Sequence, residues 1–493
     1  MKGTGNSAVV IGSGFGGLGT AALLAQHGYH VSLFEKNARL GGRASVLQDQ
    51  GFTWDMGPSW YLMPDVFERF FRLLGERVED HLELQRLSPN YRIYFEDGDI
   101  VDMTGSLERD AATFDRYEPG AGKKLREYLR LSEYQYEIAM RDFVPKNYDS
   151  LRDFFTPTVM RQGPKLRVFE SMDRYVSRFF THPKLKKIIQ YTLVFLGSSP
   201  YTTPALYNIM AHVDFNLGVW YPKGGIYEVI RVLEKLALQH GAEVKCDERV
   251  EQILVEHGRV AGVRTTSGSR PAELVVSNAD LHHTETQLLE PRYQTYRERY
   301  WAKRTFAPSA FIMYLGVRGR LPNLVHHNLY FCEDWKANFE QIFHRPGYPD
   351  NPSLYICCPS RTDPTVAPEG HENLFILAPI APGLEDTPEI RERYADHLLQ
   401  MVSERMGMPD LRDRIVVQHL FSVRDFAERY NSYRGSALGL AHTMRQTAIF
   451  RPNNRSKKVR GLYYAGAGTN PGIGMPMCLI SAELAVRRVL YGK

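Results

Sequence analysis

Short apolar runs that end at glycine or at an acidic residue dominate the N-terminal part of this 493-residue chain. The first run, Ala8–Ile11, leads into the motif Gly12-x-Gly14-x-x-Gly17, and an alanine-rich amphipathic segment follows. The second run, Val31–Phe34, ends at Glu35. A strand, a glycine turn, a helix and a second strand in this order predict a β-α-β unit, around which we expect the rest of the chain to be organised.

A β-α-β unit with these glycines is typical of dinucleotide-binding sites. Gly12 permits a tight turn, Gly14 lets a pyrophosphate approach the backbone, and the start of the helix directs N–H groups at the phosphates. Glu35 is placed to accept hydrogen bonds from the adenosine ribose hydroxyls, which favours FAD or NAD over NADP. The glycines alone would also fit a turn that binds no ligand.

A second apolar run that ends in glycine lies near the C-terminal end. The segment Gly461–Gly468 reads as a strand, Thr469–Pro476 as a turn, and Met477–Leu490 as a helix. Two such junctions, far apart in the sequence, suit an extended cofactor such as FAD with one junction at each end. The alternative is that these glycines only form turns and bind no ligand.

Between these two ends of the chain, the pattern of hydrophobic and polar residues no longer follows the β-α-β pattern throughout. Short strands and then charged, aromatic helices are expected over 86–205, the α/β pattern resumes over 206–290, and strands with one helix occupy 291–445. We therefore predict an α/β fold with a Rossmann-like FAD-binding domain and an inserted mixed α+β substrate domain. The FAD-binding domain takes residues 1–85, 206–290 and 446–493, and the substrate domain takes 86–205 and 291–445.

Composition narrows the class of protein. A hydrophobic fraction of 43% suits two or three domains, and a formal net charge of +5 does not indicate a nucleic-acid partner. The five cysteines are odd in number and form no C-x-x-C pair, so we predict neither a disulfide framework nor a metal site. No signal peptide is expected, and no apolar run approaches the roughly 20 residues of a membrane span. We expect a soluble or peripheral protein in a reducing compartment.

One basic and aromatic stretch indicates a possible membrane-facing surface. Amphipathic segments of this composition lie on anionic bilayers, although a solvated helix face has the same composition. Its basic members are Arg161, Lys165, Arg167, Arg174, Arg178, Lys184, Lys186 and Lys187, and its apolar members are Phe169, Tyr175, Phe179, Phe180 and Ile188.

Several segments together resemble one family, the bacterial and archaeal carotenoid desaturases. This group contains the phytoene and dehydrosqualene desaturases and belongs to the amine-oxidase-like flavoproteins. The resemblance covers essentially the whole chain. The matching segments are Val10–Leu18, Phe34–Asn37, Leu40–Ala44, Gly51–Pro58, Met63–Phe67, Tyr221–Gly225, Phe450–Asn454 and Gly466–Pro476.

The resemblance implies FAD as the cofactor and assigns residues to it. The ADP half and the pyrophosphate are expected near the first glycine motif and Glu35, and the flavin ring between the loops at 57–59 and 474–476. Asn470 departs from the family pattern, where histidine is more frequent. The expected FAD-binding residues are Gly12, Gly14, Phe15, Gly16, Glu35, Lys36, Gly42, Arg43, Gly57, Pro58, Ser59, Val250, Gly466, Gly468, Gly474, Met475 and Pro476.

The resemblance also implies a reaction, the dehydrogenation of phytoene toward lycopene-type carotenoids. A hydride would pass to flavin N5 and a proton would be lost, in a hydrophobic channel. Oxygen or a quinone would reoxidise the flavin, and the protein would lie in the cytoplasm on the inner face of the membrane. Asp55 is a candidate base, although a carboxylate that caps the adjacent loop is the other interpretation of this residue. The oligomeric state stays open.

Other functions remain compatible with the sequence. The enzyme could act on C30 or hydroxylated carotenoids, or oxidise terminal methyl groups to aldehydes. An amine oxidase is a different enzymatic alternative, against which the loop Gly51–Pro58 argues. A prenyl-lipid carrier similar to the GDP-dissociation inhibitors is the non-enzymatic alternative, which the FAD-type residues at both ends of the chain disfavour.

Overall fold

The computed structural model describes residues 6–149 and 170–492, together with residues 157, 161, 163 and 167. Its N-terminal unit is built on a parallel sheet with the strand order β19-β13-β1-β2-β9. Three segments far apart in the sequence supply these strands. The five strands are β1 (Ser7–Ile11), β2 (His30–Phe34), β9 (Glu243–Lys245), β13 (Leu274–Ser277) and β19 (Leu462–Tyr464).

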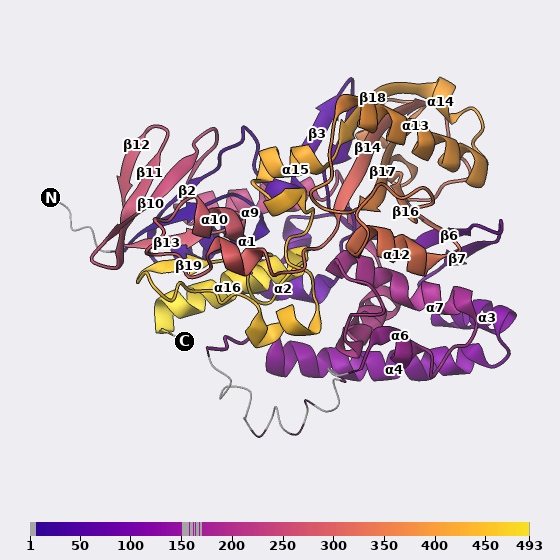
Figure 1. Ribbon diagram of the computed structural model, residues 1–493, viewed down its shortest axis with the longest axis horizontal. Helices are drawn as coiled ribbons and strands as arrows, with labels where there is room; N and C mark the ends of the chain where they lie inside the picture. Colours follow the sequence, from indigo (N-terminus) through magenta and orange to yellow (C-terminus); the bar gives the residue numbers. More distant parts are fainter. Residues whose placement is uncertain are drawn as a thin grey trace.

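Helix α1 (Phe15–Gln26) follows β1 directly, so the predicted β-α-β unit is present. Residues Phe15 to Ala25 of this helix are all buried, because it packs between α9 (Tyr227–Gln239) and α16 (Met475–Tyr491) (Figure 1). Such a helix needs small, apolar residues all round, and this explains its alanine- and glycine-rich sequence. Helix α2 (Pro64–Leu73) packs against α16.

A small antiparallel sheet, β10-β11-β12, adjoins the parallel sheet at one end of the molecule (Figure 1). Its strands pair by short turns, with Val250 opposite Thr265. The elements of this part are β10 (Val250–Glu256), β11 (Arg259–Thr265), β12 (Gly268–Pro271), α10 (Leu281–Thr286) and α11 (Glu298–Trp301).

The second large unit contains a seven-stranded sheet with the order β18-β14-β17-β16-β15-β6-β7. Strand β6 pairs with β15 in parallel, so residues of the predicted segments 86–205 and 291–445 share one sheet. The strands are β6 (Tyr91–Phe95), β7 (Ile100–Met103), β14 (Ser309–Arg318), β15 (His327–Phe331), β16 (Leu354–Cys357), β17 (His371–Ile380) and β18 (Ile415–Phe421). The associated helices are α12 (Trp335–Phe343), α13 (Pro388–Arg405), α14 (Leu411–Arg414) and α15 (Val423–Tyr430).

A helical layer lies beside this sheet and encloses the largest hydrophobic core (Figure 1). The charged, aromatic helices expected within 86–205 are present as several separate helices, and Lys165 and Phe169 of the basic stretch lie outside the described residues. None of the described helices has both the length and the apolar character that crossing a bilayer requires. The elements are α3 (Leu107–Tyr117), α4 (Ala121–Ile138), the π-turn η3 (Ala139–Phe143), α6 (Met172–Val176), α7 (Pro183–Gln190), α8 (Ile209–Ala211) and the π-turn η8 (His212–Leu217).

Two further antiparallel pairs of strands lie outside these three sheets. Strand β3 (Val46–Asp49) pairs with β4 (Phe52–Asp55), and β5 (Leu84–Arg86) pairs with β8 (Trp220–Pro222). In the loop that follows β4, Trp60 belongs to the hydrophobic core beside the seven-stranded sheet, whereas Tyr61 belongs to the core of the N-terminal unit and bridges to Trp220.

Candidate functional site

A cavity of about 1690 Å³ runs from the end of β1 into the space between the seven-stranded sheet and the helical layer. Charged and glycine residues of the N-terminal unit line one end, and aromatic and aliphatic side chains line the other. Of the expected FAD-binding residues, fifteen line this cavity: Gly12, Gly14, Phe15, Gly16, Glu35, Lys36, Gly42, Arg43, Gly57, Pro58, Ser59, Val250, Gly474, Met475 and Pro476.

The first glycine motif leaves no room for side chains. Gly12 has a φ of +88°, and a Cβ added to Gly17 would lie 1.9 Å from the carbonyl oxygen of Gly12. A Cβ on Gly14 would meet the Asn278 amide nitrogen at 3.0 Å. The chain therefore turns sharply from β1 into α1, and the N-terminus of α1 opens onto the cavity at Phe15.

Glu35 holds the loops around this turn. Its Oε2 accepts hydrogen bonds from the backbone N–H (3.0 Å) and hydroxyl (2.7 Å) of Ser13, and its Oε1 accepts from the backbone (3.0 Å) and side-chain (2.7 Å) nitrogens of Asn37. Lys36 points away from the carboxylate and donates to the carbonyl of Glu428 at 2.6 Å and to Asn431 at 2.9 Å. Burial lowers the pKa of Lys36, an effect increased by Arg249.

Arg43 carries a free donor in the same end of the cavity. Its Nη2 donates to the hydroxyl of Ser432 at 3.1 Å, and its guanidinium lies over the ring of Tyr430 at 5.6 Å. Its buried Nε has no hydrogen-bond partner among the described residues. An unsatisfied buried guanidinium N–H beside a glycine loop indicates a site for an anion such as a pyrophosphate.

The two loops expected around the flavin ring both face the cavity. A Cβ on Gly57 would lie 2.6 Å from the carbonyl oxygen of Arg43, and the Ser59 hydroxyl bonds to the Tyr355 hydroxyl at 2.6 Å. On the other side, Gly474 precedes α16 with a φ of +119°, so this helix begins at the cavity with Met475 and Pro476. Two helix N-termini, the free Arg43 donor and the side-chain-free loops fit FAD. When bound, FAD supplies a hydride acceptor.

Gly466 and Gly468 have a different role from the one expected, because they do not line the cavity. A Cβ on Gly16 would lie 2.8 Å from the Gly466 nitrogen, and a Cβ on Gly466 would lie 2.4 Å from Asn278 Oδ1. A Cβ on Gly468 would meet Leu281 at 3.0 Å. The two glycine junctions thus abut each other instead of holding opposite ends of the cofactor, and the second junction reaches the cavity through Ala467 and the loop 470–476.

Asp55 lies outside the cavity, which corrects its candidacy as a base. Its carboxylate accepts the backbone N–H groups of Ile226 (2.8 Å) and Tyr227 (3.0 Å) at the start of α9. Burial raises the pKa of Asp55 to about 7, against the effect of these two hydrogen bonds. The side chain therefore joins β4 to α9 as a helix cap.

Two residues that sequence reasoning missed brace the loop before α16. Arg451 is buried and donates to the carbonyls of Ala467 (2.7 Å) and Thr469 (3.1 Å). His442 accepts the backbone N–H of Ile473 at 3.1 Å and bonds through Nδ1 to the Tyr207 hydroxyl. A histidine thus lies beside the loop that contains Asn470, although it comes from another segment. Isolated residues of this kind carry no spacing signal in the sequence.

The far end of the cavity is mostly apolar. Met140, Val194, Met210, Val213, Phe331, Trp335 and Phe339 are among its lining residues. At its edge, Arg167, Arg174 and Arg178 line the cavity and are exposed, and Arg167 pairs with Glu170 at 3.5 Å. The basic stretch that was expected to face a membrane therefore contributes to the edge of the cavity.

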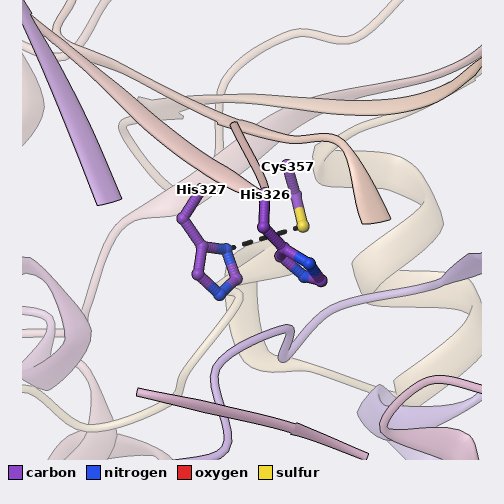
Figure 2. A group of neighbouring side chains, drawn as sticks. All are labelled: His326, His327 and Cys357. Carbon is purple, nitrogen blue, oxygen red and sulfur yellow. Dashed lines mark hydrogen bonds between the residues drawn. The ribbon is translucent and has the colours of Figure 1, made fainter. Parts of the chain in front are cut away.

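A buried group behind the cavity wall consists of His326, His327 and Cys357 (Figure 2). Their potential ligand atoms lie within 4.8 Å of one another, a proximity that the sequence did not predict. His327 Nδ1 bonds to the Tyr355 hydroxyl at 2.8 Å and lies 3.6 Å from Cys357 Sγ, and the His327 ring stacks on Trp60 with centroids 4.1 Å apart. Burial raises the pKa of the Cys357 thiol to about 12, so the group is a neutral hydrogen-bonded support for Tyr355 and Trp60.

Comparisons with known proteins agree with this geometry. Residues 15–490 match the model of the family described as flavin containing amine oxidoreductase. A carotenoid 3,4-desaturase of Haloarcula japonica is 52% identical over 97% of both chains. A zeta-carotene-forming phytoene desaturase of Myxococcus xanthus is 38% identical over 99% of this chain and 94% of its own.

Among solved structures, wild-type putrescine oxidase bound to putrescine superposes with a TM-score of 0.63 at 14% identity, over 98% of this chain and 99% of its own. This likeness supports the fold alone. The predicted fold class, the FAD cofactor and the assignment as an oxidoreductase are confirmed. The chain belongs to the flavin containing amine oxidoreductase family and, within it, to the group of the carotenoid desaturases.

Proposed function

We propose that this chain desaturates a long polyene, with phytoene as the first candidate substrate and lycopene-type carotenoids as products. The observation that carries the proposal is the continuous cavity of about 1690 Å³, which is polar at the nucleotide end and mostly apolar between Ser59 and its arginine-lined edge. A site for one small ligand occupies roughly 300–1000 Å³, so this cavity has room for a dinucleotide and a second, apolar molecule. The names of the two relatives above support a carotenoid as that second molecule.

The residues of the chain orient the two reactants and exclude water. The loops at Gly57–Ser59 and Gly474–Pro476 would hold the flavin ring at the point where the polar end meets the apolar end. Side chains such as Met210, Val213 and Phe331 would surround the saturated C–C bond and keep water away from the electron-deficient carbon that hydride loss creates. Substrate recognition would come from the shape of the channel, since a polyene hydrocarbon offers no hydrogen-bonding group.

A hydroxylated C40 polyene is the second candidate substrate. Trp335 Nε1 and Asn338 Nδ2 lie on the same face of α12, line the cavity and have no hydrogen-bond partner among the described residues. A buried donor without a partner is costly, so a substrate oxygen at this place would gain both hydrogen bonds. The hydroxyl of Ser198, which is also buried and unpaired within the described part of the chain, lines the same cavity.

The test is reconstitution in cells that make one polyene at a time: phytoene, the C30 analogue, or a hydroxylated C40 polyene. We expect longer-wavelength absorption from at least one of the C40 substrates. Asn338→Leu removes one donor and, if the hydroxylated polyene is the substrate, lowers its conversion about fivefold relative to phytoene. Colour formation with none of the three, or release of peroxide on amines, would overturn the proposal.

We further propose that the edge of the cavity faces the cytoplasmic surface of the membrane, where an apolar substrate is dissolved and oxygen or a quinone accepts the electrons. The exposed Arg167, Arg174 and Arg178 at this edge support this placement, because clustered cations are attracted to anionic lipid. Half-buried Phe343 lines the cavity as well.

A further inference from the structure

Desaturation releases a proton into a cavity whose far end is mostly apolar, so the proton needs a hydrogen-bonded route to water. A tyrosine hydroxyl on the cavity wall that bonds to a titratable side chain can begin such a route. Pairs of this kind are Tyr136 with Asp65 at 2.8 Å, Tyr355 with His327 at 2.8 Å, and Tyr207 with His442. The pairs differ in where a proton can go from the partner side chain.

Two of these pairs end inside the protein. His442 Nε2 accepts the N–H of Ile473 at 3.1 Å while Nδ1 bonds to Tyr207, so neither ring nitrogen is left to take up a proton. His327 is fully buried, its ring stacks on Trp60, and its Nε2 has no partner among the described residues. A proton that reached this nitrogen would find no onward acceptor in the described part of the chain.

The Tyr136–Asp65 pair instead crosses the wall between the cavity and the surface. Tyr136 lines the cavity, whereas Asp65 lines a separate recess of about 360 Å³. Met140 and Lys146 line both spaces, so the two spaces lie back to back at this place. Arg141 and Lys146 of the recess are exposed, and the recess is therefore accessible to water.

The position of Asp65 is not explained by a role in its own helix. Asp65 lies in the first turn of α2, where a carboxylate can stabilise the helix N-terminus. Its Oδ2, however, accepts a hydrogen bond from the hydroxyl of Tyr136 on α4, and its Oδ1 is buried without a partner among the described residues. A buried acceptor of this kind requires an explanation, and a function in proton transfer supplies one.

Tyr136 lies close to the place expected for the flavin ring. It belongs to the last turn of α4, directly before the π-turn η3, and irregular turns of this type occur frequently at functional sites. Its ring packs in a hydrophobic cluster with Met63 and Met477, which follow the two loops expected at the flavin and also line the cavity. Burial and the Asp65 carboxylate raise the pKa of Tyr136 above its ordinary value, so the wall carries a neutral hydroxyl here.

We propose that Tyr136 and Asp65 form the route by which the proton of polyene desaturation leaves the cavity for the surface recess. This inference rests on the proposed function. Tyr136 is the catalytic residue, because it lines the cavity, and Asp65 is a positioning residue that acts through it from the recess.

The route balances the reaction. A C–H bond of the substrate breaks, its proton passes to the Tyr136 oxygen, and the Tyr136 hydroxyl proton passes to Asp65 Oδ2. The C–H electron pair becomes the new C=C bond with the neighbouring carbon, whose hydride has gone to the oxidised flavin. The polyene is thereby oxidised by two electrons, and Asp65 releases the proton to water in the recess.

The test uses the FAD-loaded enzyme in neutral vesicles, with phytoene and a hydroxylated C40 polyene as probes. Tyr136→Phe and Asp65→Asn should each lower the turnover at saturating substrate about 100-fold, because phenylalanine carries no proton and asparagine keeps a hydrogen-bond acceptor that takes up none. Tyr128→Phe is the matched control and should keep the wild-type rate. Tyr128 lies in the same helix but away from the cavity, and its buried hydroxyl has no partner among the described residues.

Chemical rescue separates a proton route from a merely structural role. Asp65→Ala leaves space for a small carboxylate in a recess that cationic side chains line. These are Arg69, Arg141, Lys146 and Arg487. Formate should therefore raise the rate of Asp65→Ala about tenfold or more, whereas chloride at the same ionic strength should not, because it takes up no proton. Tyr136→Phe should respond to neither anion, because its missing group lies on the cavity side.

A further readout does not depend on turnover. Formate should raise the melting temperature of Asp65→Ala and not that of wild type, whose own carboxylate occupies the place; no shift in Asp65→Ala would contradict the open recess. The route is overturned if Tyr136→Phe or Asp65→Asn keeps the wild-type rate, or if formate restores Asp65→Ala no better than chloride does. If wild type converts neither polyene, the proposed function fails and the route fails with it. If wild type converts one of them and both variants do so equally fast, the route alone fails.

Discussion

The contact between the two glycine junctions gives the most direct test of the nucleotide site. In Gly16→Ala, the new Cβ would lie 2.5 Å from Asn278 Oδ1, 2.8 Å from the Gly466 nitrogen and 2.9 Å from the Gly466 Cα. Two of these three neighbours are backbone atoms, so the clash is relieved only if the start of α1 moves away from the loop after β19. Overpacking of this kind costs about 1–3 kcal/mol. If the strain falls on the cofactor-binding conformation, FAD affinity drops about 5- to 150-fold.

Gly19→Ala is the matched control because it lies in the same helix. Its Cβ would meet Phe70 Cζ at 3.0 Å and Leu479 at 3.3 Å, which are ends of side chains that can shift. The gain in helix propensity of up to about 1 kcal/mol offsets this crowding, so stability and FAD affinity should change little. The assay is flavin titration of the apoprotein followed by thermal unfolding. Equal FAD affinity and equal melting temperature for Gly16→Ala and wild type would refute the contact argument.

Three other changes test separate parts of the site. Glu35→Gln replaces an acceptor oxygen by an amide NH2 group, which cannot accept the hydrogen bonds that Ser13 or Asn37 donates, so FAD affinity should fall about 10- to 100-fold. The exposed control Glu256→Gln should not change FAD affinity, and equilibrium dialysis measures both variants. The pKa of Asp55 is raised in the folded state to about 7, so its contribution to stability is present at low pH and is lost as pH rises from about 4 to about 7. Chemical denaturation should show this loss for wild type and not for Asp55→Asn. The Asp55→Asn variant should still desaturate substrate with the same pH profile as wild type. Arg174→Glu at the edge of the cavity should weaken binding to anionic vesicles about tenfold, whereas Arg264→Glu on β11, at the opposite end of the molecule, should not; equal co-sedimentation of the two variants would contradict the membrane proposal.

Local patterns in the sequence were sufficient for the parts of the fold that depend on neighbouring residues. The β-α-β unit, Glu35 and the two loops expected at the flavin all line the cavity, because strand period, glycine spacing and helix starts are encoded within a few residues. Helix α12 was missed although it lines the apolar end of the cavity, since the surrounding strands dominate the apolar pattern of 291–445.

Contacts between distant segments were the part that the sequence could not provide. Asp55 reads as a polar residue in an active-site loop, and only the fold brings it to the N–H groups of Ile226 and Tyr227. The sequence suggests that Gly466 contacts the cofactor. In the structure, a side chain at Gly466 is excluded because Gly16 and Asn278 lie against it.

The position of the charged groups explains how one cavity can serve two chemically different ligands. Glu35, Lys36 and Arg43 are confined to the nucleotide end, where phosphates and ribose hydroxyls need charge and hydrogen bonds. A carboxylate in the apolar end would hold water beside the substrate, and water would capture the electron-deficient carbon that the proposed reaction forms.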